Sequence, residues 1–232
     1  HYSPLTTHHS PLTMIILLLG SGGREHTFAW KMAQSKRCSR LFIAPGNAGT
    51  STCGENVQID PLDFNAVGRF VLEHKVEMVV VGPEEPLVRG IWDYFQENEA
   101  LKNIPVIGPS KAGAVLEGSK AWSKKFMQRH KIPTAAYREF TAAELESGVE
   151  YLRQHPLPIV LKADGLAAGK GVVICEKHKV AEQEFRDMLD GKFGAAGERV
   201  VVEEFLTGIE FSVFVLTDGK TYKIQVHSNY IQ

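Results

Sequence analysis

The sequence predicts an α/β protein of two domains, in which an N-terminal doubly wound parallel-sheet domain is followed by an α+β domain. Three observations support this prediction. Short apolar runs alternate with helix-length amphipathic patterns from residue 14 to residue 116, as in a parallel sheet with helices on its faces. The pattern changes near Gly118, after which strands bracket glycine-containing turns. The length of 232 residues is enough for two ordinary domains.

In the first domain, residues 14–116, the expected strands are the apolar runs 15–19, 41–44, 78–81 and 106–107. Helices are expected between them, over 24–35, around Phe64, Val67 and Val71, and along one segment that carries Leu87, Ile91 and Phe95.

In the second domain, residues 117–232, Ser119 is expected to cap a helix that runs to Arg129, and a capping box at 141–144 begins the next helix, with an apolar stripe of Leu145, Val149 and Leu152. The later elements are strands at 158–162, 172–175 and 199–205, a helix around Ala181, Phe185 and Met188, and a hairpin whose strands, 211–216 and 221–226, flank Asp218 and Gly219.

Residues 1–13 contain a crude repeat, HYSPLT and HHSPLT, without the basic segment, apolar segment and cleavage site of a signal peptide. We expect a disordered extension there, outside the fold. The run from Met14 to Leu19 is shorter than the roughly 20 apolar residues that span a bilayer. It is therefore read as a buried strand.

The charge is nearly balanced, with 26 basic and 27 acidic residues, so no overall field favours nucleic acid or an anionic membrane as a partner. The three cysteines lie far apart and match neither a disulfide framework nor a metal-binding spacing. A reducing cytoplasm is the expected compartment.

The segment 20–23, GSGG, lies where the first strand turns into a helix, so its backbone amides can approach a phosphate. A dinucleotide fingerprint would have its third glycine where this chain has Glu25, and a carboxylate there opposes a pyrophosphate. A redox cofactor is therefore disfavoured. Tight packing of strand against helix explains the glycines equally well.

The segments 44–50, APGNAGT, and 81–87, VGPEEPL, each follow an expected parallel strand. Ligands of open α/β sheets bind beyond the carboxyl ends of the strands, so these loops and the glycine turn predict one pocket. Taken alone, each loop can also be explained as an ordinary turn, because Pro and Gly commonly follow a strand without any ligand.

The segment 162–171, KADGLAAGKG, has glycine hinges and a lysine near each end, which suits a loop that closes over a triphosphate. It is not a Walker loop, and a lysine-containing hairpin loop is the plain alternative. Lys124 is two positions from Trp122, so at about 100° per residue it points away from the expected buried face of Trp122, toward solvent or a cleft.

Strand alternation puts Glu203 and Glu204 on opposite faces at the end of an apolar run, and Glu210 follows. One of these acids can reach a ribose hydroxyl or an adenine amino group while another stays in water. Together with Lys124, Lys162 and the glycine loop, they predict a nucleotide between two sheets.

The motifs GSGGREH, APGNAG, VGPEEPL, EGSK, RHKIPTA, KADGLAAGKGV and EEFL occur in the order found in glycinamide ribonucleotide synthetases. From about residue 14 to residue 220 the chain resembles the N-terminal part of this family of ATP-grasp ligases. The resemblance implies an α/β domain at 14–116 and a truncated α+β ATP-grasp domain at 117–232, with a lid subdomain at roughly 135–202.

The activity implied by the resemblance is ATP-dependent ligation of glycine to 5-phosphoribosylamine through a glycyl phosphate, in de novo purine biosynthesis. The implied partners are small molecules, namely ATP, glycine and 5-phosphoribosylamine, with Mg²⁺ or Mn²⁺ and without nucleic acid or membrane. The oligomeric state is left open. Two alternatives remain, a nucleotide-binding chain without chemistry and another ATP-grasp carboxylate–amine ligase.

Carried over residue by residue, the resemblance implies two sets of site residues and no certain catalytic residue. The ATP-binding set is Lys124, Lys162, Gly165, Gly169, Lys170, Gly171, Glu203, Glu204, Phe205, Leu206 and Glu210. The substrate-binding set is Gly22, Gly23, Arg24, Gly46, Asn47, Ala48, Gly82, Pro83, Glu84 and Pro86.

The chain departs from the family pattern at Glu85, where an alanine is usual, and at Ile209, where a second acid is usual. Neither change removes an expected ligand. The family's metal ligands follow the segment at which this chain ends, so we expect no metal ligand within the chain, no turnover by it alone, and exposed apolar surface.

Overall fold

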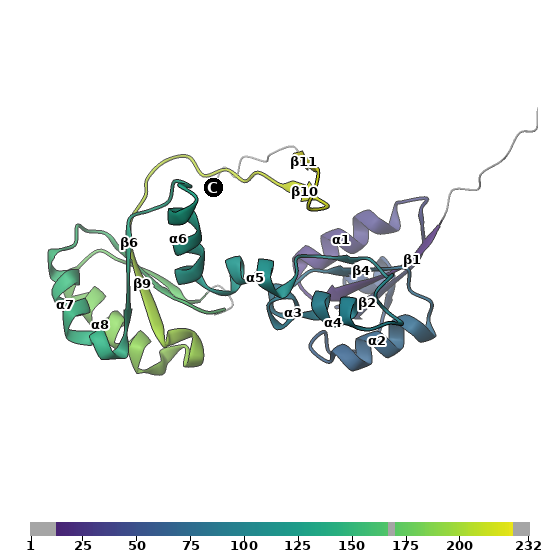
Figure 1. Cartoon of the computed structure of the whole chain (residues 1–232), viewed down its shortest axis with the longest axis horizontal. Helices are drawn as coiled ribbons and strands as arrows, with labels where there is room; N and C mark the ends of the chain where they lie inside the picture. Colours follow the sequence, from purple (N-terminus) through teal and green to yellow (C-terminus); the bar gives the residue numbers. More distant parts are fainter. Residues whose placement is uncertain (1–12, 167–169, 225–232) are drawn as a thin grey trace, which may run out of the picture.

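The computed structural model describes residues 13–166 and 170–224, which form two lobes joined through helix α5 (Figure 1). The predicted disordered extension lies almost entirely outside the described residues. In the described part of the chain, no helix is long and apolar enough to cross a membrane.

The first lobe is a five-stranded parallel sheet in the order β3-β2-β1-β4-β5. Its strands are β1 (Met14–Gly20), β2 (Cys38–Pro45), β3 (Glu55–Asn56), β4 (Met78–Val81) and β5 (Val106–Ile107). Its helices are α1 (Gly23–Ala33), α2 (Phe64–Glu73), α3 (Glu84–Arg89), α4 (Ile91–Glu97) and α5 (Lys111–Gly118), with a 3₁₀ turn at Thr50–Thr52.

Side chains of β1 alternate between two apolar cores, one on each face of the sheet. Leu17 and Leu19 pack in a cluster that includes residues of α2, α3, α4 and α5. Leu18 packs on the opposite face, with Ala29 of α1. The central strand is therefore covered on both sides, and the predicted doubly wound architecture is confirmed.

The second lobe is an antiparallel sheet in the order β6-β9-β7-β8. Its strands are β6 (Tyr137–Thr141), β7 (Ile159–Ala163), β8 (Val172–Cys175) and β9 (Arg199–Glu204). Its helices are α6 (Lys120–Arg129), α7 (Leu145–Gln154) and α8 (His178–Asp187), with a 3₁₀ turn at Ala142–Glu144, a π-type segment at Met188–Lys192 and a 3₁₀ turn at Gly194–Gly197.

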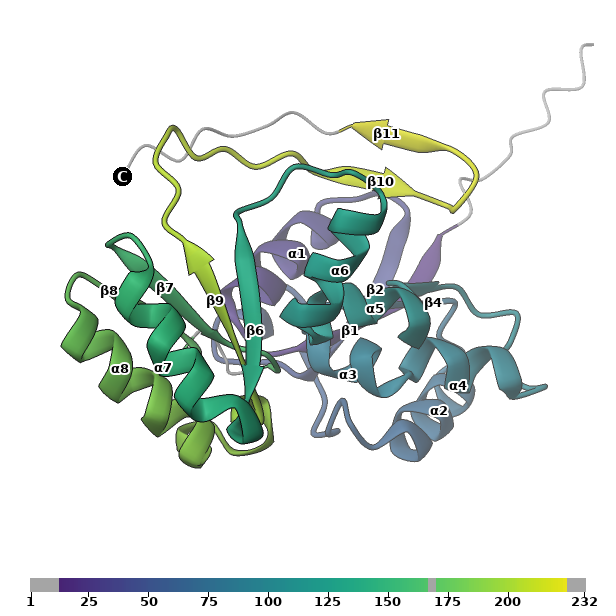
Figure 2. The same ribbon diagram turned by 60° about the vertical axis from the view of Figure 1, so that its left-hand side comes forward.

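Helices α7 and α8 lie side by side on one face of this sheet (Figure 2). Phe140 and Phe185 meet there edge to face, with ring centroids 5.6 Å apart, in the core of the lobe. The helices thus use one face of the sheet, and the polar side chains Lys162 and Glu203 belong to the other.

Several local predictions needed correction, and helix α5 was not predicted at all. The single helix expected through Leu87 and Phe95 is two helices, because Gly90 adopts a left-handed φ of 98° between them. Strand β6 was not predicted; its five residues pair with β9. The short strand β3 was also missed.

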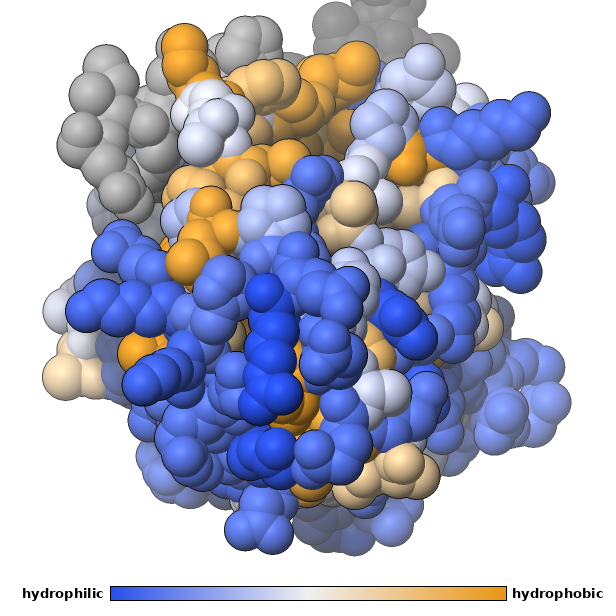
Figure 3. Space-filling model, turned by 90° about the vertical axis from the view of Figure 1, so that its left-hand side faces the viewer, coloured by the Kyte–Doolittle hydropathy of each residue, from blue (hydrophilic) through white to orange (hydrophobic). Residues whose placement is uncertain are grey.

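The predicted hairpin is present in a shorter form, as β10 (Val215–Thr217) and β11 (Tyr222–Ile224), with Gly219 at a φ of 84°. Residues 212–214, which were expected in its first strand, do not belong to a strand. Residues 225 and 226, the end of the predicted second strand, lie outside the described residues. Apolar side chains before and within it are exposed, among them Ile209, Phe211 and Leu216. In Figure 3 apolar side chains gather in the upper part of the face, above a largely hydrophilic surface.

Candidate functional site

A cavity of about 1100 Å³ lies between the two lobes, and side chains of both line it. Eight of the predicted site residues are among those that line it: Arg24, Pro83, Glu84, Lys124, Lys162, Gly171, Glu203 and Leu206. The cavity therefore combines parts of both predicted sets.

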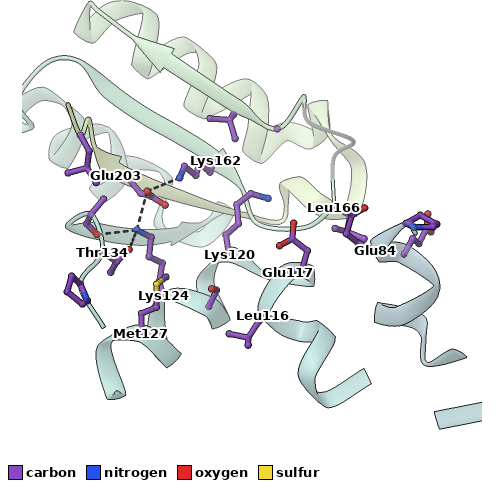
Figure 4. Close-up of a pocket in the computed structure, with 18 of the residues that line it drawn as sticks. Glu84, Leu116, Glu117, Lys120, Lys124, Met127, Thr134, Lys162, Leu166 and Glu203 are labelled. Atoms are coloured by element: carbon purple, nitrogen blue, oxygen red, sulfur yellow. Dashed lines mark hydrogen bonds and ion pairs between the residues drawn. The ribbon is translucent and has the colours of Figure 1, made fainter. Parts of the chain in front are cut away.

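One buried carboxylate is shared by two lysines in the wall of this cavity. The Oε2 atom of Glu203 lies 2.9 Å from the Nζ atom of Lys162 and 3.1 Å from that of Lys124 (Figure 4). The Glu203 side chain is 5% exposed and that of Lys124 6%. Glu204, at the next position of β9, is exposed, which confirms the predicted alternation.

The predicted orientation of α6 was wrong in one respect. Lys124 does line a cavity, but it is buried, whereas Trp122 is 36% exposed and stacks on Phe126 along the outside of the helix. The reason is that α6 turns its lysine side toward β9, where the Glu203 carboxylate offsets the cost of burying an ammonium.

Lys120 is a cavity residue that the sequence reasoning did not single out. Its Nζ atom donates to the carbonyl oxygen of Gly165 at 3.0 Å, at the start of the glycine loop. Burial lowers the pKa of Lys120, and the charge of Lys162 lowers it further, against the opposing effect of Asp164. A signal was available, because Lys120 and Lys124 are four residues apart and so share one helix face.

The glycine loop joins β7 to β8 and borders the cavity on both sides of its tip. Gly165 precedes the tip, and its N–H donates to the carbonyl oxygen of Ala196 at 3.3 Å. Lys170 is exposed, and Gly171 accepts from the Ala163 N–H at 2.7 Å. Gly169 lies outside the described residues.

The three strand-end loops of the first lobe lie together, because β2, β1 and β4 are neighbours. The Nδ2 atom of Asn47 donates to the Ser21 carbonyl oxygen at 2.7 Å. Arg24 donates to the Gly82 carbonyl oxygen at 2.9 Å and to Glu84 at 2.8 Å. The other predicted substrate-side residues are also in or beside these loops. Gly22 and Gly23 lie at the start of α1, and Gly46 and Ala48 follow β2. Pro83 immediately precedes α3, and Pro86 is buried within that helix.

Glu25 fills the space inside the glycine turn. Its Oε2 atom accepts from the Gly22 N–H at 2.6 Å, so that amide is already paired within the chain. A Cβ on Gly82 would lie 2.3 Å from the Oε1 atom of Glu25, and one on Gly20 would lie 2.5 Å from its Cγ. Packing around Glu25 thus accounts for part of the glycine content of these loops.

The remaining predicted nucleotide residues follow β9. The Oε1 atom of Glu204 accepts from the Ala136 N–H at 2.8 Å, and Phe205, Leu206 and Glu210 are exposed beyond it. Among the described residues no group of three or more His, Cys, Asp or Glu side chains is placed to hold a metal ion.

An α/β lobe followed by an antiparallel sheet, with lysines and a glycine loop at a cavity between them, defines an ATP-grasp type of chain. Residues 14–117 match the phosphoribosylglycinamide synthetase N domain, and residues 118–230 match the ATP-grasp (A) domain of the same synthetase. The chain belongs to the phosphoribosylglycinamide synthetase family, as the sequence motifs predicted.

Curated relatives support this assignment. The chain is 51% identical over 210 residues to the phosphoribosylamine–glycine ligase of Haemophilus influenzae, covering 89% of this chain and 48% of the relative. It is 51% identical over 211 residues to that of Pseudomonas aeruginosa, covering 89% and 47%. The chain thus spans about half the length of the curated relatives it matches.

Solved structures share the fold. The phosphoribosylamine–glycine ligase of Thermotoga maritima superposes with a TM-score of 0.71 at 31% identity, covering 91% of this chain and 49% of that one. An N5-carboxyaminoimidazole ribonucleotide synthetase in complex with ADP superposes with a TM-score of 0.69 at 17% identity, covering 94% and 54%. Because its sequence identity is only 17%, the second match supports the fold and nothing more.

Proposed function

We propose that the chain binds ATP in the cavity between its lobes, as part of a ligase that joins glycine to 5-phosphoribosylamine in de novo purine biosynthesis. The observation that carries the proposal is the convergence of Lys120, Lys162 and the two ends of the glycine loop on one cavity. Ammonium groups and loop amides are the groups that neutralise a triphosphate.

The proposed contacts combine residues of the cavity wall with residues assigned by the family resemblance. Lys120 and Lys162, which line the cavity, reach the phosphates, and the glycine loop, which borders the cavity at Leu166 and Gly171, lies beside them. The end of β9 meets the adenine, through Glu203, Glu204, Phe205 and Leu206, and Glu210 lies toward the ribose. The strand-end loops of the first lobe face 5-phosphoribosylamine, with Arg24 and Glu84 at the cavity.

The proposed ligation has two steps. A glycine carboxylate oxygen attacks the γ-phosphorus of ATP, which forms glycyl phosphate and releases ADP. The amine of 5-phosphoribosylamine then attacks the glycyl carbonyl carbon, the amide bond forms, phosphate leaves and the amine gives up a proton. The groups of this chain act by holding the anionic reactants close together and offsetting their charge.

A second candidate function is nucleotide binding without turnover. It rests on the same cavity, because lysines and loop amides can hold a triphosphate whether or not a phosphoryl group is then transferred. For either function we propose that the protein acts in the cytoplasm, because its three cysteines are free thiols, as is usual in a reducing compartment.

Isothermal titration of the purified chain with Mg·ATP tests the proposal. Saturable binding is expected, and Lys162→Ala should abolish it, whereas Lys125→Ala should not, because Lys125 is exposed and pairs with Glu139 away from the cavity. Absence of binding by the wild-type chain would reject the nucleotide site. Glycine and 5-phosphoribosylamine are then added, and glycine-dependent release of ADP would separate ligation from binding alone.

A further inference from the structure

We infer that Lys124 is a positioning residue: it is the permanent counter-ion of Glu203, and it thereby frees Lys162 to leave Glu203 for a nucleotide phosphate. The inference rests on the proposed nucleotide site. It assigns different tasks to two lysines that share one carboxylate oxygen.

The ammonium group of Lys124 is surrounded by partners within the chain. It donates to the Thr134 Oγ1 atom at 2.8 Å and to the Ala135 carbonyl oxygen at 3.1 Å, and it forms an ion pair with the Glu203 Oε2 atom at 3.1 Å. Each contact is within the chain and the lysine is buried. To reach a phosphate, Lys124 would have to give up its bond to the buried Ala135 carbonyl oxygen and its pairing with Glu203, which is costly.

Lys162 is arranged differently. Among the described residues, the only polar contact of its Nζ atom is with Glu203, and its side chain is 27% exposed, against 6% for Lys124. Two of its donors thus have no partner within 13–166 and 170–224, and Lys162 lines the cavity. Figure 4 shows Glu203 between the two ammonium groups, with Thr134 on the far side of Lys124.

The reason for two lysines lies in the cost of a buried charge. If Lys162 moved to a phosphate and Glu203 had no other partner, a carboxylate with almost no exposure would be left uncompensated. Because Lys124 stays in place, Glu203 keeps a counter-ion during that exchange. Lys124 thus raises nucleotide affinity through Glu203, without a contact to the nucleotide.

A double-mutant cycle tests this inference, with Mg·ATP affinity measured by titration calorimetry. Lys124→Met alone should weaken binding by about tenfold, the size expected for a charge-assisted hydrogen bond. In the Glu203→Gln background the same change should cost little, because no buried carboxylate then needs a counter-ion. Lys125→Met, next along α6 and exposed, is the matched control and should bind as wild type does.

Circular dichroism checks that each variant folds. If Lys124→Met alone does not fold, the comparison of Glu203→Gln with the double variant still decides, since their affinities should be alike. A tenfold loss from Lys124→Met in both backgrounds would mean that Lys124 acts on the phosphates directly, and would overturn the inference while leaving the nucleotide site intact. No ATP binding by the wild-type chain would overturn both.

Discussion

The hydroxyl group of Ser119 donates to the carboxylate of Asp164 at 3.0 Å, and this contact joins the start of α6 to the end of β7. The same carboxylate accepts from the Ala121 N–H at 2.7 Å. Asp164 thus satisfies a free donor of the first helical turn and places a negative charge at the positive end of the helix dipole. Since α6 carries Lys120 and β7 carries Lys162, the contact fixes the spacing of the two proposed phosphate ligands.

We expect Asp164→Ala to lower the free energy of unfolding by about 2 kcal/mol, because two hydrogen bonds to a charged acceptor are lost. Ser119→Ala should cost less, about 1 kcal/mol, as for an ordinary helix cap. Urea unfolding measures both. Asp164→Ala should also weaken ATP binding more than Ser119→Ala does. If the Asp164→Ala chain were as stable as wild type, other contacts and not Asp164 would fix α6 against β7.

The pH dependence of ATP binding should report on Lys120. Burial lowers the pKa of this lysine, so its cationic form is lost earlier, as the pH rises, than that of an exposed lysine with a pKa of about 10.4. An ammonium favours phosphate binding only while protonated, so affinity should fall on the alkaline side. Calorimetric titrations at increasing pH should show a steeper fall in ATP affinity for wild type than for Lys120→Met. The affinity of Lys120→Arg should fall less than that of wild type, because the arginine keeps its charge throughout. Equal slopes in wild type and Lys120→Met would exclude this role.

Much of the fold could be predicted because it depends on local patterns. The apolar runs around Leu17 and Val80 indicated parallel strands directly, and alternation along β9 separated Glu203 from Glu204. Strand β6 could not be predicted from its own residues. It begins at Tyr137 and carries Arg138 and Glu139, and its strand state depends on pairing with β9, which is distant in sequence.

The site was predicted less completely for the same reason. The glycine loop and Lys162 stand out as a motif, whereas the pairing of Lys124 with Glu203 depends on how closely α6 approaches β9. The filling of the glycine turn by Glu25 likewise requires a side chain to fold back across its own turn, which spacing does not reveal. Tertiary contacts thus decided which predicted side chains face the cavity.

Gly148→Ala should destabilise the second lobe even though alanine is the better helix former. A Cβ at this position of α7 would lie 2.4 Å from the Cζ atom of Phe185 and 3.3 Å from the Cδ1 atom of Phe140, and both rings are fully buried. Overpacking of this kind typically costs 1–3 kcal/mol, roughly, against a gain of about 1 kcal/mol in helix propensity. Thermal and urea unfolding measure the net loss. Glu150→Ala, exposed on the same helix, is the control, and a stabilised Gly148→Ala chain would contradict the packing described.

The stability of the β6–β9 pairing should depend on pH through Glu139. Burial alone would raise the pKa of Glu139, but hydrogen bonds from Lys125 and Arg199 outweigh it and hold the pKa below its usual value. A carboxylate whose pKa is depressed on folding stabilises the protein above its unfolded pKa, about 4.3 for Glu, and this contribution is lost as the pH falls through the folded value. Glu139→Gln should therefore lower stability by up to about 1 kcal/mol at neutral pH, since both partners are partly exposed. The difference from wild type should vanish in acid and shrink in high salt. Urea unfolding at a series of pH values measures it, and a difference that stays constant into acid would show that the loss is one of packing and not of charge.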